Sequence, residues 1–300
     1  CDIIRVAVPD MAAARAVAKI KEESPLPVVV DIHFDYKLAL EAIAAGADKV
    51  RINPGNIGGE DRVKAVAQAC QQRGIPIRIG VNGGSLEKPI LAKSGGVTPE
   101  ALVESAFGHI RLLEKFDFTD ICVSLKSSSV PITMKAYQLM SQESNYPLHI
   151  GVTEAGTVRM GTLKSAVGIG GLLALGVGDT MRVSLSADPV EEVYAARDIL
   201  KAAGIRKDGA ELVSCPTCGR TRIDLISLAN QVEQRLKTVD KPITVAVMGC
   251  VVNGPGEASA ADCGIAGGVG EGLLLKKGQI IKKVPQDQLV DELFRLIDTL

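Results

Sequence analysis

Residues 76–82 read PIRIGVN, a stretch in which apolar and polar side chains alternate. The apolar side chains are Ile77, Ile79 and Val81. Arg78 and Asn82 belong to the opposite set. Such alternation is typical of a β-strand, because successive side chains point to opposite faces of a sheet. An arginine in the second set indicates that the other face of this strand is polar.

Six further segments share this alternation, and helical segments separate them. They are IIRVAV (3–8), PVVVDI (27–32), KVRIN (49–53), ICVSLK (121–126), PLHIGV (147–152) and MRVSLS (181–186). The intervening segments include MAAARAVAKIKEE (11–23) and EDRVKAVAQACQQRG (60–74), which have the spacing of amphipathic helices. Repeated βα units build a parallel sheet. We therefore predict a TIM-type βα barrel with seven of its eight strands present and one βα unit missing at its start.

The βα rhythm stops near GIRKDG (204–209). We place the domain boundary there, with the barrel at 1–206 and a small α+β domain at 207–300. In the second domain the pattern predicts a strand before the motif CPTC, a helix, a strand ending near Cys250, a hairpin and a closing amphipathic helix.

Composition excludes several classes of function. Lys and Arg total 34 against 35 Asp and Glu, so no global basic field exists to hold nucleic acid or an anionic membrane. The longest apolar stretch, GIGGLLALGVG (168–178), is too short for a membrane span, and its glycines lack the preceding strand of a dinucleotide-binding loop. Seven cysteines, an odd number, do not suggest a disulfide framework. We expect a reducing compartment, the cytoplasm or, in a plastid-bearing source, the stroma.

The polar set of the predicted strands is rich in cations. If the apolar set faces the helices, the polar set points into the barrel. Its members are Arg5, Asp31, Arg51, Asn53, Arg78, Asn82, Ser124, Lys126, His149, Arg182 and Ser184. One arginine could simply brace the barrel, but five cations against Asp31 favour an anionic ligand, and a diphosphate suits the donor fork of arginine. His33 and Glu154 also follow strands, at the end where barrel catalysts lie, although a structural, hydrogen-bonded role is the commoner one for a histidine such as His33.

Three thiols of the second domain follow strands: Cys215 and Cys218 in the motif CPTC, and Cys250. A zinc ribbon would require a second CxxC pair, which Cys250 does not supply. Three thiolates therefore favour an iron–sulfur cluster with one unusual fourth ligand, for which Glu257 and Cys263 are the alternatives. The remaining cysteines, Cys1, Cys70 and Cys122, are expected to be buried packing residues.

Six motifs together resemble the 4-hydroxy-3-methylbut-2-enyl diphosphate synthase family: CPTC, GCVVNGPGE, DIHFD, RINPGN, RIGVNGGSLEK and RVSLSADPVEE. The resemblance runs along the whole chain. It implies a TIM barrel with a small 4Fe-4S domain, and reductive ring opening and dehydration of 2-C-methyl-D-erythritol 2,4-cyclodiphosphate to (E)-4-hydroxy-3-methylbut-2-enyl diphosphate in isoprenoid biosynthesis. It also implies two electrons from flavodoxin or ferredoxin and a homodimer.

The resemblance assigns roles to individual residues. It implies cluster ligands at Cys215, Cys218, Cys250 and Glu257. It implies diphosphate contacts at Arg51, Arg78, Asn82, Lys126, Arg182 and Ser184, which Arg5 is expected to join. Glu257 is expected to exchange during catalysis, and Glu154 to handle the proton that accompanies loss of water. The alternative function is a non-redox barrel that binds phosphorylated metabolites and carries a zinc-bound interaction module.

Overall fold

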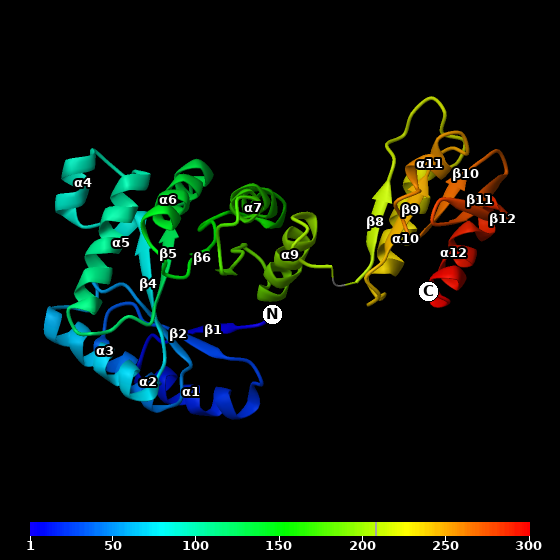
Figure 1. Ribbon diagram of the computed structural model, residues 1–300. Helices are drawn as coiled ribbons and strands as arrows, with labels where there is room; N and C mark the ends of the chain where they lie inside the picture. Colours follow the sequence, from blue (N-terminus) through cyan, green and yellow to red (C-terminus); the bar gives the residue numbers. More distant parts are fainter. Residues whose placement is uncertain (208) are drawn as a thin grey trace. The chain divides into compact units, whose positions relative to one another are not determined.

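The computed structural model describes residues 1–207 and 209–300, which form two compact units, Cys1–Ala203 and Gly204–Leu300 (Figure 1). The predicted boundary segment 204–209 includes Asp208, which lies outside the described residues. Among the described helices, none combines the length and the apolar character needed to cross a membrane.

Parallel strands in chain order form the centre of the first unit. They are β1 (Ile4–Ala7), β2 (Val28–Asp31), β3 (Lys49–Ile52), β4 (Ile77–Asn82), β5 (Ile121–Lys126), β6 (His149–Ile150) and β7 (Thr180–Met181). A bridge between Val123 and Leu148 connects the β1–β5 sheet to the β6–β7 pair. All predicted strands are present, but β6 and β7 are shorter than predicted. Within the described ranges β7 pairs with β6 and no hydrogen-bonded ladder joins β7 to β1, so β7 has a neighbouring strand on one side.

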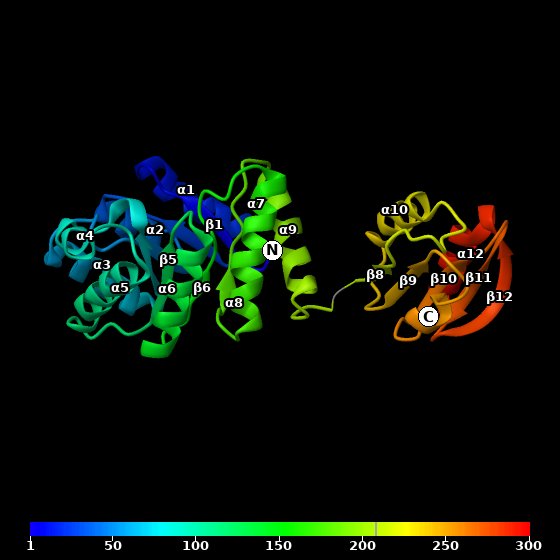
Figure 2. The same ribbon diagram turned by 90° about the horizontal axis from the view of Figure 1, so that it is seen from above.

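Helices follow the strands and flank them (Figure 2). They are α1 (Met11–Glu23), α2 (Tyr36–Ala44), α3 (Glu60–Arg73), α4 (Lys88–Ser94), α5 (Pro99–Glu114), α6 (Val130–Glu143), α7 (Val158–Ser165), α8 (Gly171–Ala174) and α9 (Pro189–Ala202). Side chains cap several N-termini, as where Asp10 accepts from the Ala13 N–H at 2.8 Å. The glycine-rich stretch that begins at Gly168 runs through a π-helical turn (Ala166–Gly170) into α8.

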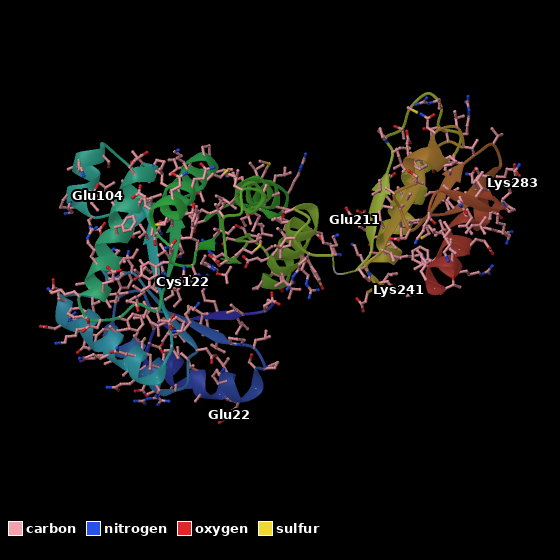
Figure 3. All side chains as sticks on the ribbon, in the orientation of Figure 1. Glu22, Glu104, Cys122, Glu211, Lys241 and Lys283 are labelled. Carbon is pink, nitrogen blue, oxygen red and sulfur yellow. The ribbon has the colours of Figure 1, made fainter. Side chains whose placement is uncertain are left out.

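The apolar set of the strands packs against these helices in one core, which includes Val30, Ile52, Ile79, Val123 and Ile150. The opposite set lies on what we call the inward face and carries the buried polar side chains Asp31, Arg51, Arg78 and Ser124. This division confirms the predicted alternation. Of the cysteines expected to pack, Cys70 lies in the core and Cys1 is exposed before β1, so the expectation for Cys1 was wrong. Cys122 lies on β5 (Figure 3). It is buried, as expected, but it alternates with Val123 and so lies outside the cluster that contains Cys70.

The second unit is a mixed sheet with strand order β12-β11-β10-β9-β8. Its strands are β8 (Glu211–Ser214), β9 (Thr244–Met248), β10 (Cys263–Gly267), β11 (Glu271–Lys276) and β12 (Gln279–Pro285). The first three are parallel, and β11 and β12 add an antiparallel hairpin. Helices α10 (Leu225–Leu236) and α12 (Leu289–Asp298) share one hydrophobic cluster with the sheet. The residues around α11 (Gly254–Glu257) contribute to a second cluster.

Candidate functional site

Asp31 is at the centre of the buried charges on the inward face. Arg51 Nη1 donates to Asp31 Oδ1 at 2.7 Å, and Arg5 Nη1 lies 3.4 Å from Asp31 Oδ2. Burial alone would raise the pKa of the Asp31 carboxyl, but the charges of Arg51, Arg5 and Lys126 outweigh burial and lower this pKa. Asp31 is therefore ionised and compensates part of the positive charge.

Gly80 on β4 makes room for the Arg51 side chain. Arg51 Nη2 donates to the Gly80 carbonyl at 3.1 Å, so the guanidinium lies across the glycine backbone. A Cβ at Gly80 would lie 2.7 Å from Arg51 Cζ and closer still to two of its nitrogens. Only glycine permits this approach. Sequence reasoning missed this residue, although a glycine at an inward position between Ile79 and Val81 was a signal of close backbone contact.

Substituting Gly80 by alanine is expected to move the Arg51 guanidinium away from Asp31 without unfolding the chain, because the clash falls on the end of a flexible side chain. We expect pyrophosphate to bind about tenfold more weakly, as for loss of one hydrogen bond to a charged group. Isothermal titration calorimetry measures this. Gly108→Ala in α5 is the control, since a Cβ there meets nothing within 4 Å. Equal affinities for the two variants would show that Gly80 does not position the anion site.

Arg78 is a buried cation of this face. It is 4% exposed, and among the described residues its Nε and Nη2 atoms are buried without a hydrogen-bond partner. Burial, and next the charge of Arg5, lower its pKa to about 10. Because an unpaired buried charge is costly, these nitrogens mark a place where an anion would stabilise the fold.

Lys126 and Arg182 extend the cationic group. Burial, followed by the charges of Arg51 and Arg182, lowers the pKa of Lys126 to about 7. Burial lowers the pKa of Arg182 as well, and its Nη1 donates to Ser184 Oγ. Lys126 is also the register partner of Asn82, whose Oδ1 accepts from the Gly84 N–H at 3.1 Å. The structure therefore brings together the predicted cations on one face, close enough for their charges to act on one another.

Glu154 and His33 lie on loops after strands. Glu154 follows β6 and is exposed. Its φ is 51°, a backbone conformation that residues other than glycine adopt only at a cost in free energy. His33 is exposed after β2, and its ring centroid lies 6.1 Å from that of Phe34. The backbone of Glu154 is thus unusual at a position predicted to be catalytic, whereas His33 shows no comparable feature among the described residues.

In the second unit, the CPTC motif (215–218) is held against the end of β9. The Gly249 N–H donates to Cys215 Sγ at 3.2 Å, and the Arg222 N–H donates to the Gly249 carbonyl at 3.1 Å. Cys218 is exposed, and hydrogen bonds from Arg220, first from its backbone, lower the pKa of the Cys218 thiol. A lowered thiol pKa favours the thiolate, which is the form that binds metals.

The segment after Cys250 turns back on itself in α11. The Gly254 N–H donates to the Cys250 carbonyl at 3.1 Å, and Glu257 ends the short helix, exposed to solvent. A Cβ at Gly254 would lie 2.7 Å from the Ala266 Cβ, so glycine allows the turn to approach β10 closely. The segment 250–257 is therefore a compact turn that carries Cys250 at its start and Glu257 at its end.

The predicted ligands lie on two connected loops. With its amide oxygen turned toward Arg220, Asn253 accepts from both terminal guanidinium nitrogens at 3.3 Å and so links the two loops. Across residues 1–207 and 209–300, no group of three or more His, Cys, Asp or Glu side chains converges to hold a metal ion. The donor set nevertheless has the chemistry of an iron–sulfur site. Cys263, the alternative fourth ligand, differs from the exposed Cys218. It is 1% exposed in β10, and burial raises the pKa of its thiol to about 11.

Comparison with known proteins defines the class. Residues 1–197 match the model described as the GcpE TIM-barrel domain, and residues 211–299 match the GcpE protein C-terminal domain. The chain therefore belongs to the GcpE family. The predicted TIM-type barrel followed by a small second domain is confirmed.

Two relatives in particular share the name 4-hydroxy-3-methylbut-2-en-1-yl diphosphate synthase (flavodoxin). The protein of Caldanaerobacter subterraneus subsp. tengcongensis is 60% identical over 298 residues, covering 99% of this chain and 84% of its own length. That of Clostridium acetobutylicum is 61% identical over 300 residues, covering 100% and 86%. The match to a solved structure, that of Yersinia pestis dihydropteroate synthase, covers 68% of this chain and 83% of the other, with 16% identity and a TM-score of 0.44. The family resemblance inferred from the six motifs is confirmed.

Proposed function

We propose that this chain is an iron–sulfur oxidoreductase that opens the ring of 2-C-methyl-D-erythritol 2,4-cyclodiphosphate with two electrons and loss of water. The product is (E)-4-hydroxy-3-methylbut-2-enyl diphosphate, in isoprenoid biosynthesis. Residues 1–206 bind the substrate and residues 207–300 hold the cluster. One observation supports the proposal most: Arg78 is buried in a cationic inward face, and two of its nitrogens have no hydrogen-bond partner among the described residues. The relatives' name, which specifies a diphosphate, agrees with this chemistry.

The inward face binds and orients the diphosphate. Arg78 supplies unpartnered donors, and Arg5, Arg51, Lys126 and Arg182 contribute charge, with Asn82 and Ser184 as polar contacts. Asp31 fixes Arg51 in place and compensates part of the positive charge of the face. Because the pKa of Lys126 is about 7 without an anion, binding of a diphosphate would raise it and draw a proton onto the amine.

In this proposal Cys215, Cys218, Cys250 and Glu257 hold a 4Fe-4S cluster. The supporting observations are the donor chemistry, the hydrogen bond from Gly249 to Cys215 and the link between the two loops. When bound, the cluster supplies electrons one at a time and an iron whose carboxylate ligand is held more weakly than its thiolates. Glu154, in its unusual backbone conformation, holds the proton that accompanies loss of water.

The proposed electron donor is flavodoxin, which the relatives' names specify, with ferredoxin as the alternative. We further propose a cytoplasmic homodimer, as the family resemblance implies.

Lys126→Ala and Arg182→Ala test the binding role. Each charge-assisted contact is worth about 1.5–3 kcal/mol, so both variants are expected to bind the cyclodiphosphate at least about tenfold more weakly. The visible spectrum of the cluster should not change, since neither residue belongs to the second unit. Lys93→Ala, which removes an exposed lysine paired with Glu104, is the control. Normal substrate affinity in both test variants would remove the inward face from the proposal.

A further inference from the structure

His149 is a second group on the inward face with an unused ring nitrogen. Its neighbour Ile150 is fully buried in the core, so alternation places His149 on the opposite, inward side of β6. Among the described residues, its Nε2 atom is buried without a hydrogen-bond partner. Its backbone carbonyl accepts from the buried Tyr137 hydroxyl at 2.6 Å, which fixes the strand at this point.

The environment keeps the imidazole neutral and near cations. Burial, followed by the charges of Arg78 and Arg182, places the pKa of His149 well below its ordinary value. A neutral imidazole carries one ring proton, so one nitrogen donates and the other accepts. The Nδ1 atom lies 2.9 Å from Thr180 Oγ1, on the adjacent β7.

The two tautomers differ in what they offer an anion. If the Thr180 hydroxyl donates to Nδ1, the proton is on Nε2, and Nε2–H becomes an unpartnered donor like the nitrogens of Arg78. In the other tautomer the Nε2 lone pair would face the anion and repel it. An anion held by Arg78 therefore favours the first tautomer.

We infer that His149 is a further contact of the substrate's diphosphate, donating its Nε2–H to a phosphate oxygen, and that Thr180 is the positioning residue that fixes this tautomer. The inference deepens the proposed function and rests on it. A neutral donor adds a hydrogen bond without adding charge to a face whose cations already lower one another's pKa values.

Three variants of the 300-residue chain test this inference, with inorganic pyrophosphate as the probe in calorimetry. His149→Leu removes the donor and is expected to weaken binding about tenfold, whereas His149→Gln, whose amide can replace the Nε2–H, should remain within about threefold of wild type. Thr180→Val removes the hydroxyl while keeping the shape of the side chain, and its affinity should fall between these two. Wild-type affinity in His149→Leu would overturn the inference.

Nitrogen-15 NMR of the imidazole in the wild-type chain, recorded before and after addition of pyrophosphate, needs no variant to fold. With pyrophosphate bound, we expect protonated Nε2, unprotonated Nδ1 and an Nε2 resonance displaced by the new hydrogen bond, whereas the resonance of a merely structural histidine would not move. A proton on Nδ1 would overturn the inference. Lys126→Ala distinguishes a failure of this inference from a failure of the proposed function. If that variant binds pyrophosphate weakly while His149→Leu binds it normally, the inference fails alone; if both bind normally, the proposed function fails as well.

Discussion

Replacing Asp31 by alanine is expected to lower the free energy of unfolding by about 3–5 kcal/mol, because removal of one partner leaves a buried charge without compensation. Arg51, 5% exposed and 2.7 Å from the carboxylate, is the charge left behind. Urea denaturation of the 300-residue chain measures the change. Glu104→Ala, which removes one side of an exposed ion pair, should cost at most about 1 kcal/mol. Equal stability of the two variants would contradict this account of the inward face.

The same ion pair predicts how stability depends on pH. The pKa of Asp31 is lowered in the folded chain, so its contribution is fully present above the pKa of an unfolded aspartate, about 4, and is lost as pH falls through the folded pKa. Below pH of about 4, wild type should therefore lose stability more steeply than Asp31→Asn, which has no carboxylate to protonate.

The second large effect concerns Glu257. Glu257→Cys is expected to retain a cluster and to lose turnover by about 10- to 100-fold, the range typical of changes around metal sites, because a thiolate is held more tightly than a carboxylate. Glu257→Ala should hold the cluster less securely. Iron content and visible spectra measured beside turnover separate the two effects.

Cys263→Ser is the matched control, since this thiol is buried in β10 and should affect neither the cluster nor turnover. Full activity in a Glu257→Cys chain with four thiolate ligands would contradict an exchangeable carboxylate. Loss of the cluster in Cys263→Ser would identify Cys263 as the fourth ligand instead.

The alternation of single residues along the strands predicted much of the first unit. It located every strand and the residues of the inward face, because a two-residue period separates the two faces of a strand wherever it occurs. It could not predict which charges pair, because pairing depends on side-chain conformations. Arg51 binds Asp31, whereas two nitrogens of Arg78 have no hydrogen-bond partner in the described part of the chain. The alternation also predicted β6 and β7 to be longer than they are, because the length of a strand depends on its pairing as well as on the local pattern.

The second unit shows a different limit. The sequence predicted that Cys215 and Cys250 follow successive strands of the chain. The structure pairs these strands, β8 and β9, and the Gly249 N–H donates to Cys215 Sγ. The choice between Glu257 and Cys263 was open from the residues alone, because it depends on burial. The structure places Cys263 inside the sheet and Glu257 at the surface, which supports the glutamate.

The most direct test of the central claim is metal and sulfide analysis of the chain after anaerobic purification. An iron–sulfur oxidoreductase should be brown and contain roughly four iron and four sulfide per chain. Cys250→Ser should lose both. A colourless chain with stoichiometric zinc and no sulfide would contradict the account and support a non-redox barrel with a zinc-bound interaction module.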